Sequence, residues 1–417
     1  MPDSTAVFHP HPLHRLWRWL PSRPRRRALT QATALIAPRP DLNPPPPAHG
    51  LAVGGELSRA SGLGEGARLM LLGAEQLGLP SWLLDVGPPV RERAPDHAPP
   101  RNETPRNETP PAGVPLVLHI NAPLLPLAML RLGRKVLRGR PIIGYWAWEL
   151  PIVPPDWHAA VKFVHEVWVP SRFTAEALED LLPGRVRVVP HPVAIATPTA
   201  EPDRHGFGLP PDTVTVLVSF NLASSFERKN PLAAIAAFRA AFGDRNDRLL
   251  VIKIGFPDHF PADLARLHEA IGGSRNIRLD AGTLSPQRSR SLTASVDIVL
   301  SLHRSEGFGL VPAEAMLLGK PVIATGWSGN MDFMDASCAV PIGYRLVPVQ
   351  DPRGVYDIPG AVWAEADLNE TVEQLRRLAD DPALRAGMGA RARAAAQARL
   401  TTAPLAAALR GLGLTLP

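Results

Sequence analysis

The chain has 417 residues, of which 45% are hydrophobic and 20% charged, a composition typical of a globular protein with two or three domains. Its single cysteine, Cys338, excludes an intramolecular disulfide and a thiolate metal cluster, and it favours a reducing compartment. The formal net charge of +6 favours anionic partners without choosing among nucleoside diphosphates, anionic lipids and nucleic acids. No apolar run reaches the roughly 20 residues of a membrane-spanning helix, so we expect a cytoplasmic protein.

Residues 1–49 are basic and rich in proline, and we expect them to be disordered, with residues 40–50 as an extended linker. The first 27 residues place Trp17, Trp19 and Leu20 among arginines, which also suits peripheral contact with an anionic membrane. Prolines interrupt any long amphipathic helix there, which favours a solvated tail.

Residues 50–192 alternate between short apolar runs and helical patterns, which predicts a first domain with a parallel sheet. The expected strands are 51–54, 81–86, 116–120, 142–146, 166–169 and 186–189, and the expected helices are 67–77, 155–163 and one opened by Ser171. Residues 88–115 are rich in proline and contain the repeat RNETP twice, at 101–105 and 106–110. We interpret this segment as a flexible surface insertion.

A polar stretch from His191 to Pro211 resembles a hinge, and the alternation then restarts, which predicts a second domain over residues 193–390. Its expected strands are 214–220, 249–254, 277–280, 297–302 and 321–325, with helices near 231–242, 261–271, 286–294 and 312–318. Residues 391–417 are helical by propensity. The predicted fold class is α/β, with two Rossmann-like domains.

Two glutamates follow the strand that ends at His303: Glu306 in the loop and Glu314 in the first turn of the next helix. Ligands of doubly wound sheets bind at this carboxyl edge, and Gly307 and Gly309 allow the backbone to approach a ligand closely. Carboxylates there can accept hydrogen bonds from sugar hydroxyls, and helix-start amides can bind phosphate. Helix capping by Glu314 and a solvated loop position for Glu306 are equally compatible with the local pattern.

The stretch from Glu306 to Thr325 closely resembles the signature of family 4 (group 1) glycosyltransferases: two glutamates with seven residues between them, Phe-Gly-Leu among those seven, and Gly-Lys-Pro-Val after the helix. The resemblance implies the GT-B architecture, two facing Rossmann-like domains around a cleft. It also implies that Glu306 contacts the donor sugar, Glu314 the ribose, and the backbone of Phe308, Gly309 and Leu310 the sugar and diphosphate. The loop containing Ser328, Gly329 and Asn330 would close over the donor sugar.

Arg228 and Lys229 precede Asn230 and Pro231, a good N-cap and first residue for the helix 231–242. Two cations beside a helix start could neutralise a leaving diphosphate, although most Arg-Lys pairs are simply solvated. The family resemblance assigns the diphosphate to an Arg and a Lys, and Lys229 matches directly. The family's Arg often lies earlier, where this chain has Asn221, so Arg228 is the less direct match.

A glycine-rich segment, Gly62, Gly64 and Gly66, precedes a helix, and Asp85 follows at a strand end. This arrangement weakly resembles a dinucleotide fingerprint, so an NAD-dependent oxidoreductase is the rival interpretation. The family resemblance instead places Gly62 and Gly64 near the donor phosphates and the acceptor.

The segment Gly144–Pro151, with Trp146, Trp148 and Glu149, resembles the acceptor side of a bacterial subgroup of the same family. Its aromatics could stack on sugars, but many such tryptophans only fill cores. His119 at the end of a strand is a further candidate, with a structural role as the alternative.

The chain contains no Asp-x-Asp pair and no metal-ligand spacing of histidines, so we expect metal-independent chemistry without a cofactor. The expected function is retaining transfer of a hexosyl group from a nucleoside diphosphate sugar to a glycan or lipid-linked acceptor, in bacterial cell-surface polysaccharide or glycoconjugate synthesis. No nucleic-acid partner is expected. The alternative from a different class is a non-catalytic subunit that binds a nucleotide or a glycan.

Overall fold

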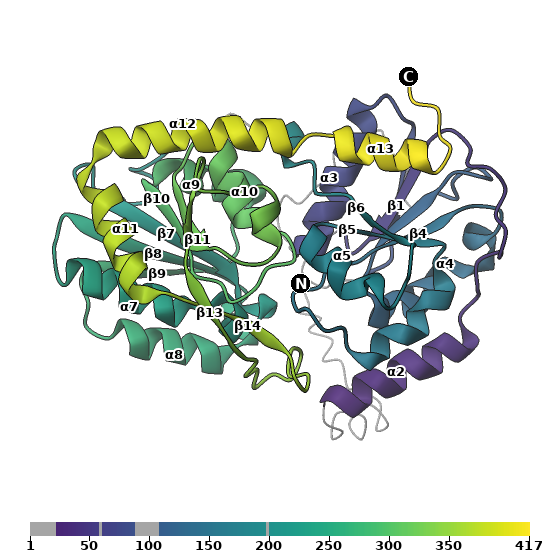
Figure 1. The fold of residues 1–417 in the computed structure, drawn as a ribbon, viewed down its shortest axis with the longest axis horizontal. Helices are drawn as coiled ribbons and strands as arrows, with labels where there is room; N and C mark the ends of the chain where they lie inside the picture. The colour runs from purple at the N-terminus through teal and green to yellow at the C-terminus, as the bar shows by residue number, and fades with distance from the viewer. Residues whose placement is uncertain (1–21, 58–60, 88–107, 197–199) are drawn as a thin grey trace, which may run out of the picture.

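The computed structural model describes residues 22–57, 61–87, 108–196 and 200–417. The RNETP repeats up to residue 107 and the basic tail up to residue 21 lie outside this part of the chain. Two units lie side by side in Figure 1, each built around a parallel six-stranded sheet with helices on both faces. The predicted α/β class with two Rossmann-like units is confirmed.

The first sheet has the order β2-β1-β3-β4-β5-β6. Its strands are β1 (Leu51–Gly55), β2 (Ser81–Asp85), β3 (Leu116–His119), β4 (Ile142–Tyr145), β5 (Glu166–Val169) and β6 (Val186–Val188). The helices are α3 (Gly62–Gln76), α4 (Leu125–Leu137), α5 (Arg172–Glu179) and the 3₁₀ segments η1 (Ala122–Leu124), η2 (Pro155–Phe163) and η3 (Val193–Ala196). α3 begins at Gly62, so the expected start of this helix at residue 67 is wrong: the glycine-rich segment belongs to the helix, and Ser61 caps it.

The second sheet has the order β12-β11-β10-β7-β8-β9. Its strands are β7 (Val214–Asn221), β8 (Arg248–Gly255), β9 (Ile277–Ala281), β10 (Ile298–Ser301), β11 (Val322–Thr325) and β12 (Val340–Ile342). Its helices are η4 (Leu222–Ser224), α6 (Phe226–Lys229), α7 (Pro231–Phe242), η5 (Pro257–His259), α8 (Pro261–Ile271), α9 (Pro286–Ser295), α10 (Leu310–Leu317), η6 (Gly329–Asp332) and α11 (Leu368–Asp380). From β7 the chain adds β8 and β9 on one side, and it then continues with β10, β11 and β12 on the other side. The sheet therefore has a topological switch point between β7 and β10, where a ligand crevice is expected.

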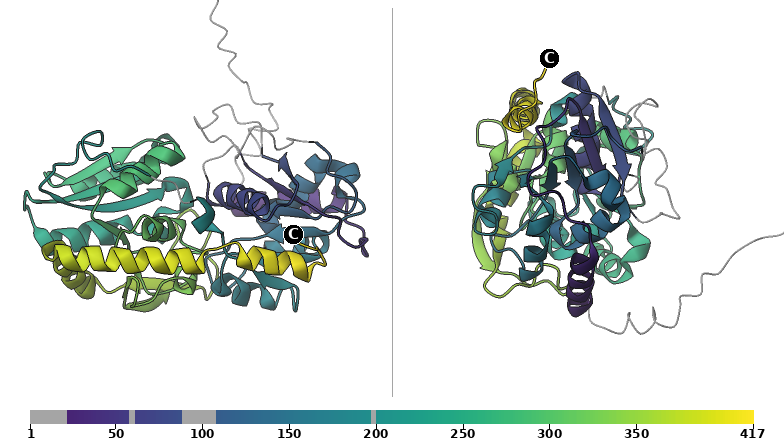
Figure 2. Two further views of the ribbon diagram at one scale, coloured as in Figure 1. Left: turned by 90° about the horizontal axis from the view of Figure 1, so that it is seen from above. Right: turned by 90° about the vertical axis from the view of Figure 1, so that its right-hand side faces the viewer.

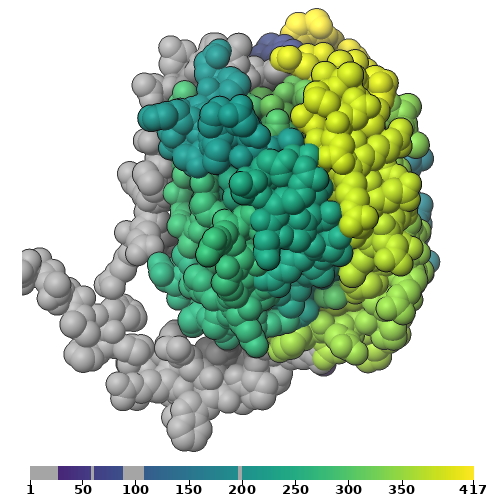
Figure 3. Space-filling model, turned by 90° about the vertical axis from the view of Figure 1, so that its left-hand side faces the viewer, coloured from purple at the N-terminus to yellow at the C-terminus, as the bar shows by residue number. Residues whose placement is uncertain are grey.

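Two C-terminal helices join the units: α12 (Pro382–Arg399) and α13 (Ala403–Gly411). Figure 2 shows them running along both units, and Figure 3 shows the C-terminal residues along one edge of the second unit's outer face. α13 buries Leu405 and Leu409 in the cluster that contains Leu51 and Val53 of β1. The predicted boundary at residue 390 falls inside α12 and is wrong, because alanine-rich helical propensity continues on both sides of it.

A hairpin of β13 (Tyr344–Pro348) and β14 (Val362–Ala366) lies between the units and was not predicted. Trp363 of β14 and Tyr356 of the connecting loop belong to the same buried cluster as Trp146 and Trp157 of the first unit. The hairpin therefore ties the second unit to the core of the first.

The prediction of disorder over residues 1–49 is wrong from residue 22 onward. Helix α2 (Ser22–Ile36) packs against α4, and Thr30 Oγ1 donates a hydrogen bond of 2.9 Å to the carbonyl of Pro123. The proline-rich stretch that follows is also attached, since Ala48 N donates to the carbonyl of Gly113 at 2.9 Å. Burial of Thr30 and Ala34 against the first unit outweighs the propensity of the basic, proline-rich sequence.

The predicted insertion at 88–115 is wrong at its C-terminal end. The buried Arg140 guanidinium donates to the carbonyls of Pro110 at 2.8 Å and Val114 at 3.1 Å, which fixes this end on the first sheet. None of the helices in the described residues has the length and apolarity to cross a membrane.

Candidate active site

A cavity of about 590 Å³ lies where the carboxyl edges of the two sheets face each other. The second unit contributes residues that follow β7 and β10, among them Lys229 and Glu306, and the first unit contributes residues that follow β1, β3 and β4. β7 and β10 are hydrogen-bonded neighbours, so the loops that leave them must meet at the switch point. This topology brings together two motifs that lie far apart in the sequence.

Glu306 is paired with both predicted cations. Its Oε2 accepts a hydrogen bond of 3.0 Å from Arg228 Nη1, and its Oε1 accepts one from Lys229 Nζ. All three side chains are largely buried, with exposed fractions of 9%, 4% and 16% for Glu306, Arg228 and Lys229. Burial alone would raise the pKa of Glu306, but the charges of Lys229 and Arg228 outweigh it and hold the pKa far below its ordinary value. Glu306 is therefore an ionised, poorly basic carboxylate.

The two cations sit on the short helix α6, between two residues with left-handed backbone: Ser225 with φ 73° and Asn230 with φ 51°. Arg228 Nη1 also donates 2.8 Å to the carbonyl of Ser305, which ties α6 to the Glu306 loop. The predicted N-cap role of Asn230 is wrong, because its side chain donates to Glu365 Oε1 at 3.1 Å and makes no cap hydrogen bond. The Asn230 side chain thus forms a hydrogen bond with Glu365 of β14 in place of a capping hydrogen bond to α7.

The residues predicted to close over the donor form hydrogen bonds with the backbone of the Glu306 loop. Glu306 N donates to Ser328 Oγ at 2.8 Å, and Gly329 N donates to the carbonyl of Glu306 at 2.9 Å. Asn330 Oδ1 lies 3.0 Å from His303 Nε2. Among the described residues that line the cavity, Ser328, Gly329 and Asn330 do not appear. The predicted closing role is not seen, since these residues support the backbone of the loop.

The first unit also forms contacts with the Glu306 loop. Ser171 Oγ, at the start of α5, donates a hydrogen bond of 2.6 Å to the carbonyl of Gly307. A side chain at Gly307 would place its Cβ 3.2 Å from the carbonyl oxygen of Trp148. Gly307 therefore lets the two units approach closely at the wall of the cavity.

Helix α10 opens at Gly309, whose φ of 100° is the left-handed conformation that glycine adopts without strain. No described side chain caps this helix, so its first amides are available to a ligand at Leu310 and Val311, which line the cavity. Phe308 also lines the cavity, and its ring meets the ring of His191 at 4.9 Å between centroids.

Glu314 lines the cavity from the second turn of α10, one turn later than predicted. Burial, together with the charge of Glu65, raises the pKa of Glu314 from 4.5 to about 7, against an opposing effect of Arg290. The pKa of Glu314 thus lies near neutral pH, unlike that of Glu306.

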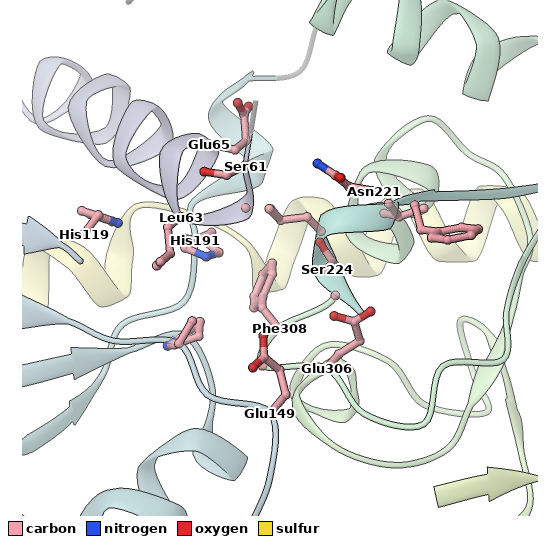
Figure 4. Close-up of a pocket in the computed structure, with 18 of the residues that line it drawn as sticks. Ser61, Leu63, Glu65, His119, Glu149, His191, Asn221, Ser224, Glu306 and Phe308 are labelled. Atoms are coloured by element: carbon pink, nitrogen blue, oxygen red, sulfur yellow. The ribbon is translucent and has the colours of Figure 1, made fainter. Parts of the chain in front are cut away.

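On the first unit, the N-terminus of α3 lines the cavity with Gly62, Leu63 and Glu65 (Figure 4). Gly64 is not among the lining residues of the described chain, and its amide donates to Ser61 Oγ at 3.1 Å. The assignment of Gly64 to the ligand side is therefore corrected to a capping role.

His119 and His191 line the cavity on either side of Tyr145. The rings of His119 and Tyr145 stack at 4.2 Å, and the Tyr145 hydroxyl lies 3.2 Å from His191 Nδ1. Burial lowers the pKa of His119 well below its usual value, and it lowers that of His191 to about 3. Both rings are neutral at physiological pH.

Trp148 and Glu149 are adjacent in sequence, but only Glu149 lines the cavity within the described chain. Trp148 packs against Trp157 at 5.1 Å and donates from Nε1 to the carbonyl of Ile152 at 2.9 Å. Its assignment to a sugar platform is corrected to a core role, because its indole N–H is already hydrogen-bonded and its ring is packed against other buried aromatic rings. Glu149 accepts a hydrogen bond of 3.0 Å from Tyr356, a lining residue that no sequence pattern indicated.

Residues 169–409, more than half of the chain, match the model of the family described as "Family 4 Glycosyltransferase in conflict systems". The chain belongs to the family 4 glycosyltransferases. The matched region contains Arg228, Lys229, Glu306 and Glu314, so the predicted resemblance is confirmed at the level of the family. This membership is at odds with the interpretation of the Gly62 segment as the dinucleotide site of an oxidoreductase.

The chain is also similar to two curated D-inositol 3-phosphate glycosyltransferases. The protein from Kineococcus radiotolerans is 29% identical over 227 residues, which are 52% of this chain and 48% of the relative. The protein from Corynebacterium urealyticum is 33% identical over 107 residues, 26% of this chain and 24% of the relative. The aligned parts thus span about half of these relatives, or less.

Solved structures share the fold at low identity. Anabaena HepE in complex with UDP and glucose superposes with a TM-score of 0.60 and 14% identity, covering 88% of this chain and 100% of HepE. WaaG, a glycosyltransferase involved in lipopolysaccharide biosynthesis, gives a TM-score of 0.55 and 17% identity, over 86% of this chain and 99% of WaaG. These likenesses confirm the expected GT-B fold.

Proposed function

We propose that this family 4 protein transfers a hexosyl group from a nucleoside diphosphate sugar to a glycan or lipid-linked acceptor, with retention of anomeric configuration. The observation that carries the proposal is the buried contact of Glu306 with Arg228 and Lys229 beside the uncapped start of α10. A carboxylate, two cations and free helix amides suit a sugar joined to a diphosphate.

The diphosphate would lie between the α10 amides and the two cations. Arg228 and Lys229 together with the helix start would stabilise the charge that develops on the leaving diphosphate, a role that a metal ion has in other enzymes. Glu314 would then meet the ribose hydroxyls. The likeness to HepE, whose structure contains UDP and glucose, supports a uridine nucleotide as the first donor to test.

Retention is proposed from the state of Glu306. A carboxylate held by two cations is a weak base and a weak nucleophile, so it suits orientation of the sugar better than covalent attack. Same-face attack by the acceptor, with the leaving phosphate taking its proton, needs no enzymic nucleophile.

A role in bacterial cell-surface polysaccharide or glycoconjugate synthesis is part of the proposal. It rests on the family and on the likeness to WaaG, which takes part in lipopolysaccharide biosynthesis. The lone Cys338 supports a cytoplasmic location, and the arginines among the first 27 residues support peripheral contact with an anionic membrane.

The donor site can be tested by thermal shift with UDP, GDP, ADP and the hexose derivatives of these three nucleotides, and with NAD as the ligand of the rival interpretation. A nucleoside diphosphate at one hundred times its Kd should stabilise the protein by about 2.7 kcal/mol. Stabilisation by NAD alone, or by none of these compounds, would contradict the proposal.

A second test replaces Glu306 by Gln, which keeps the shape but removes the charge. We expect transfer to fall about 10²- to 10³-fold. UDP should bind at least as tightly, because Arg228 and Lys229 would no longer be neutralised by a carboxylate. Glu269→Gln, an exposed change on α8, is the control and should retain full activity. Normal turnover of Glu306→Gln would remove Glu306 from the mechanism.

A further inference from the structure

Tyr356 belongs to the second unit by sequence but lies in the core of the first. It is in the loop that joins β13 to β14, and its ring packs 5.4 Å from the ring of Trp148 with 6% of the residue exposed. The same residue reaches the cavity that contains Glu306. A side chain that only filled the core would not need to end at this wall.

The hydroxyl of Tyr356 has a defined partner. It donates a hydrogen bond of 3.0 Å to Glu149 Oε2, and the guanidinium carbon of Arg228 lies 5.7 Å from the centre of the Tyr356 ring. Burial raises the pKa of Tyr356, so the hydroxyl keeps its proton and remains a donor. Tyr356 thus contacts both a first-unit carboxylate and a second-unit cation.

Glu149 has one carboxylate oxygen available. Oε2 is occupied by Tyr356, whereas Oε1 lies 3.8 Å from Arg228 Nη2, which is too long for a hydrogen bond. No donor in the described chain lies within hydrogen-bond distance of Oε1, and the side chain is 18% exposed at the cavity wall. The carbonyl of Glu149 is held by Ser305 Oγ, so the backbone is fixed as well.

Arg228 links the two carboxylates. Its Nη1 contacts Glu306 at 3.0 Å and its Nη2 lies 3.8 Å from Glu149, so the carboxylates of the two units flank one guanidinium. Figure 4 shows Glu149 and Glu306 close together at one side of the opening, with Glu65 and Ser61 across from them. A sugar held at Glu306 would therefore meet its acceptor beside Glu149.

We propose that Glu149 Oε1 accepts a hydrogen bond from a hydroxyl of the acceptor other than the one that reacts, and that Tyr356 is the positioning residue that orients Glu149 for this contact. This inference rests on the proposed transferase function. It assigns no proton transfer to Glu149 or to Tyr356, because the leaving phosphate can take the acceptor proton. The alternative is a purely structural lock between the two units.

The test compares transfer with hydrolysis of the donor by water. Wild-type protein is screened with UDP- and GDP-hexoses against octyl glycosides to select a working donor and acceptor. Tyr356→Phe, which removes one oxygen and keeps the ring, should lower kcat for transfer at least tenfold and raise KM for the glycoside. Donor hydrolysis and UDP affinity should change less than twofold. Tyr344→Phe on exposed β13 is the matched control and should leave both rates unchanged.

A double-variant experiment separates positioning from structure. Glu149→Gln should lower transfer at least as much as Tyr356→Phe, and adding Tyr356→Phe to Glu149→Gln should cost less than a further twofold. Multiplicative losses, or equal losses of hydrolysis and transfer in Tyr356→Phe, would overturn the inference in favour of a structural lock. If wild-type protein neither binds a nucleoside diphosphate nor turns over a donor, the proposed function itself fails, and this inference fails with it.

Discussion

Glu306 and Glu314 belong to one motif but have opposite electrostatic environments. Glu306 is ionised by contact with Arg228 and Lys229, whereas Glu314 is half-buried near Glu65, and its pKa rises to about 7. Desolvation acts on both carboxyl groups, and only Glu306 has cations close enough to overcome it. Their different protonation follows from single neighbouring side chains and not from the motif itself.

The raised pKa of Glu314 predicts a pH dependence of stability. The folded protein binds this proton more tightly than the unfolded chain, so the free energy of unfolding should fall as pH rises from about 4.5 to about 7. The slope from this group is at most about 1.4 kcal/mol per pH unit. Glu314→Gln should lack the fall, so its stability relative to wild type should increase over this range in denaturant titrations without ligand. Parallel pH profiles for the two proteins would show that Glu314 does not titrate there.

Helix α3 illustrates a constraint at the scale of one element. Gly66 faces His191, and a Cβ at this position would lie 2.3 Å from His191 Cε1. The His191 ring is buried and lies 3.2 Å from the Tyr145 hydroxyl, so it has little room to move. Gly66 is thus required by packing between α3 and the segment that leads to the second unit.

Gly66→Ala should therefore destabilise the protein by about 1–3 kcal/mol despite the higher helix propensity of alanine. The measurement is thermal or chemical unfolding. Gly62→Ala in the same helix is the control for stability, because the nearest atom to its Cβ would be 3.9 Å away. If both variants were equally stable, the contact with His191 would not limit this position.

At the scale of the whole molecule, the contacts that hold the units together include the hairpin β13–β14, the hydrogen bond from Ser171 to the Glu306 loop, and helix α13 on the first unit. Leu409 of α13 is fully buried next to β1. Leu409→Ala should cost about 2–5 kcal/mol of unfolding free energy. Arg410→Ala, at the neighbouring exposed position, should change it by no more than about 0.5 kcal/mol. An equal, small effect of both changes would mean that α13 does not stabilise the pair of units.

The sequence by itself determined the elements whose periodicity is local and the loops that follow them. Helices 231–242 and 261–271 were predicted with the bounds that α7 and α8 have, and Glu306 was placed after its strand. Strands buried on both faces and helix-start residues leave a clear local pattern, which is why these elements could be read. Helix α2 was missed, because its formation depends on packing against α4.

Only the tertiary structure decided which side chains meet. Arg228 and Glu306 are 78 residues apart, and they meet because β7 and β10 are neighbours at the switch point of the sheet. Tyr356 reaches Glu149 across 207 residues from a loop without periodicity. Ser328 and Trp148 were assigned to the ligand by their motifs. In the structure Ser328 accepts a hydrogen bond from the backbone of Glu306, and Trp148 packs in the core and donates to the carbonyl of Ile152. Contact partners depend on long-range packing, which one sequence records only as residue types.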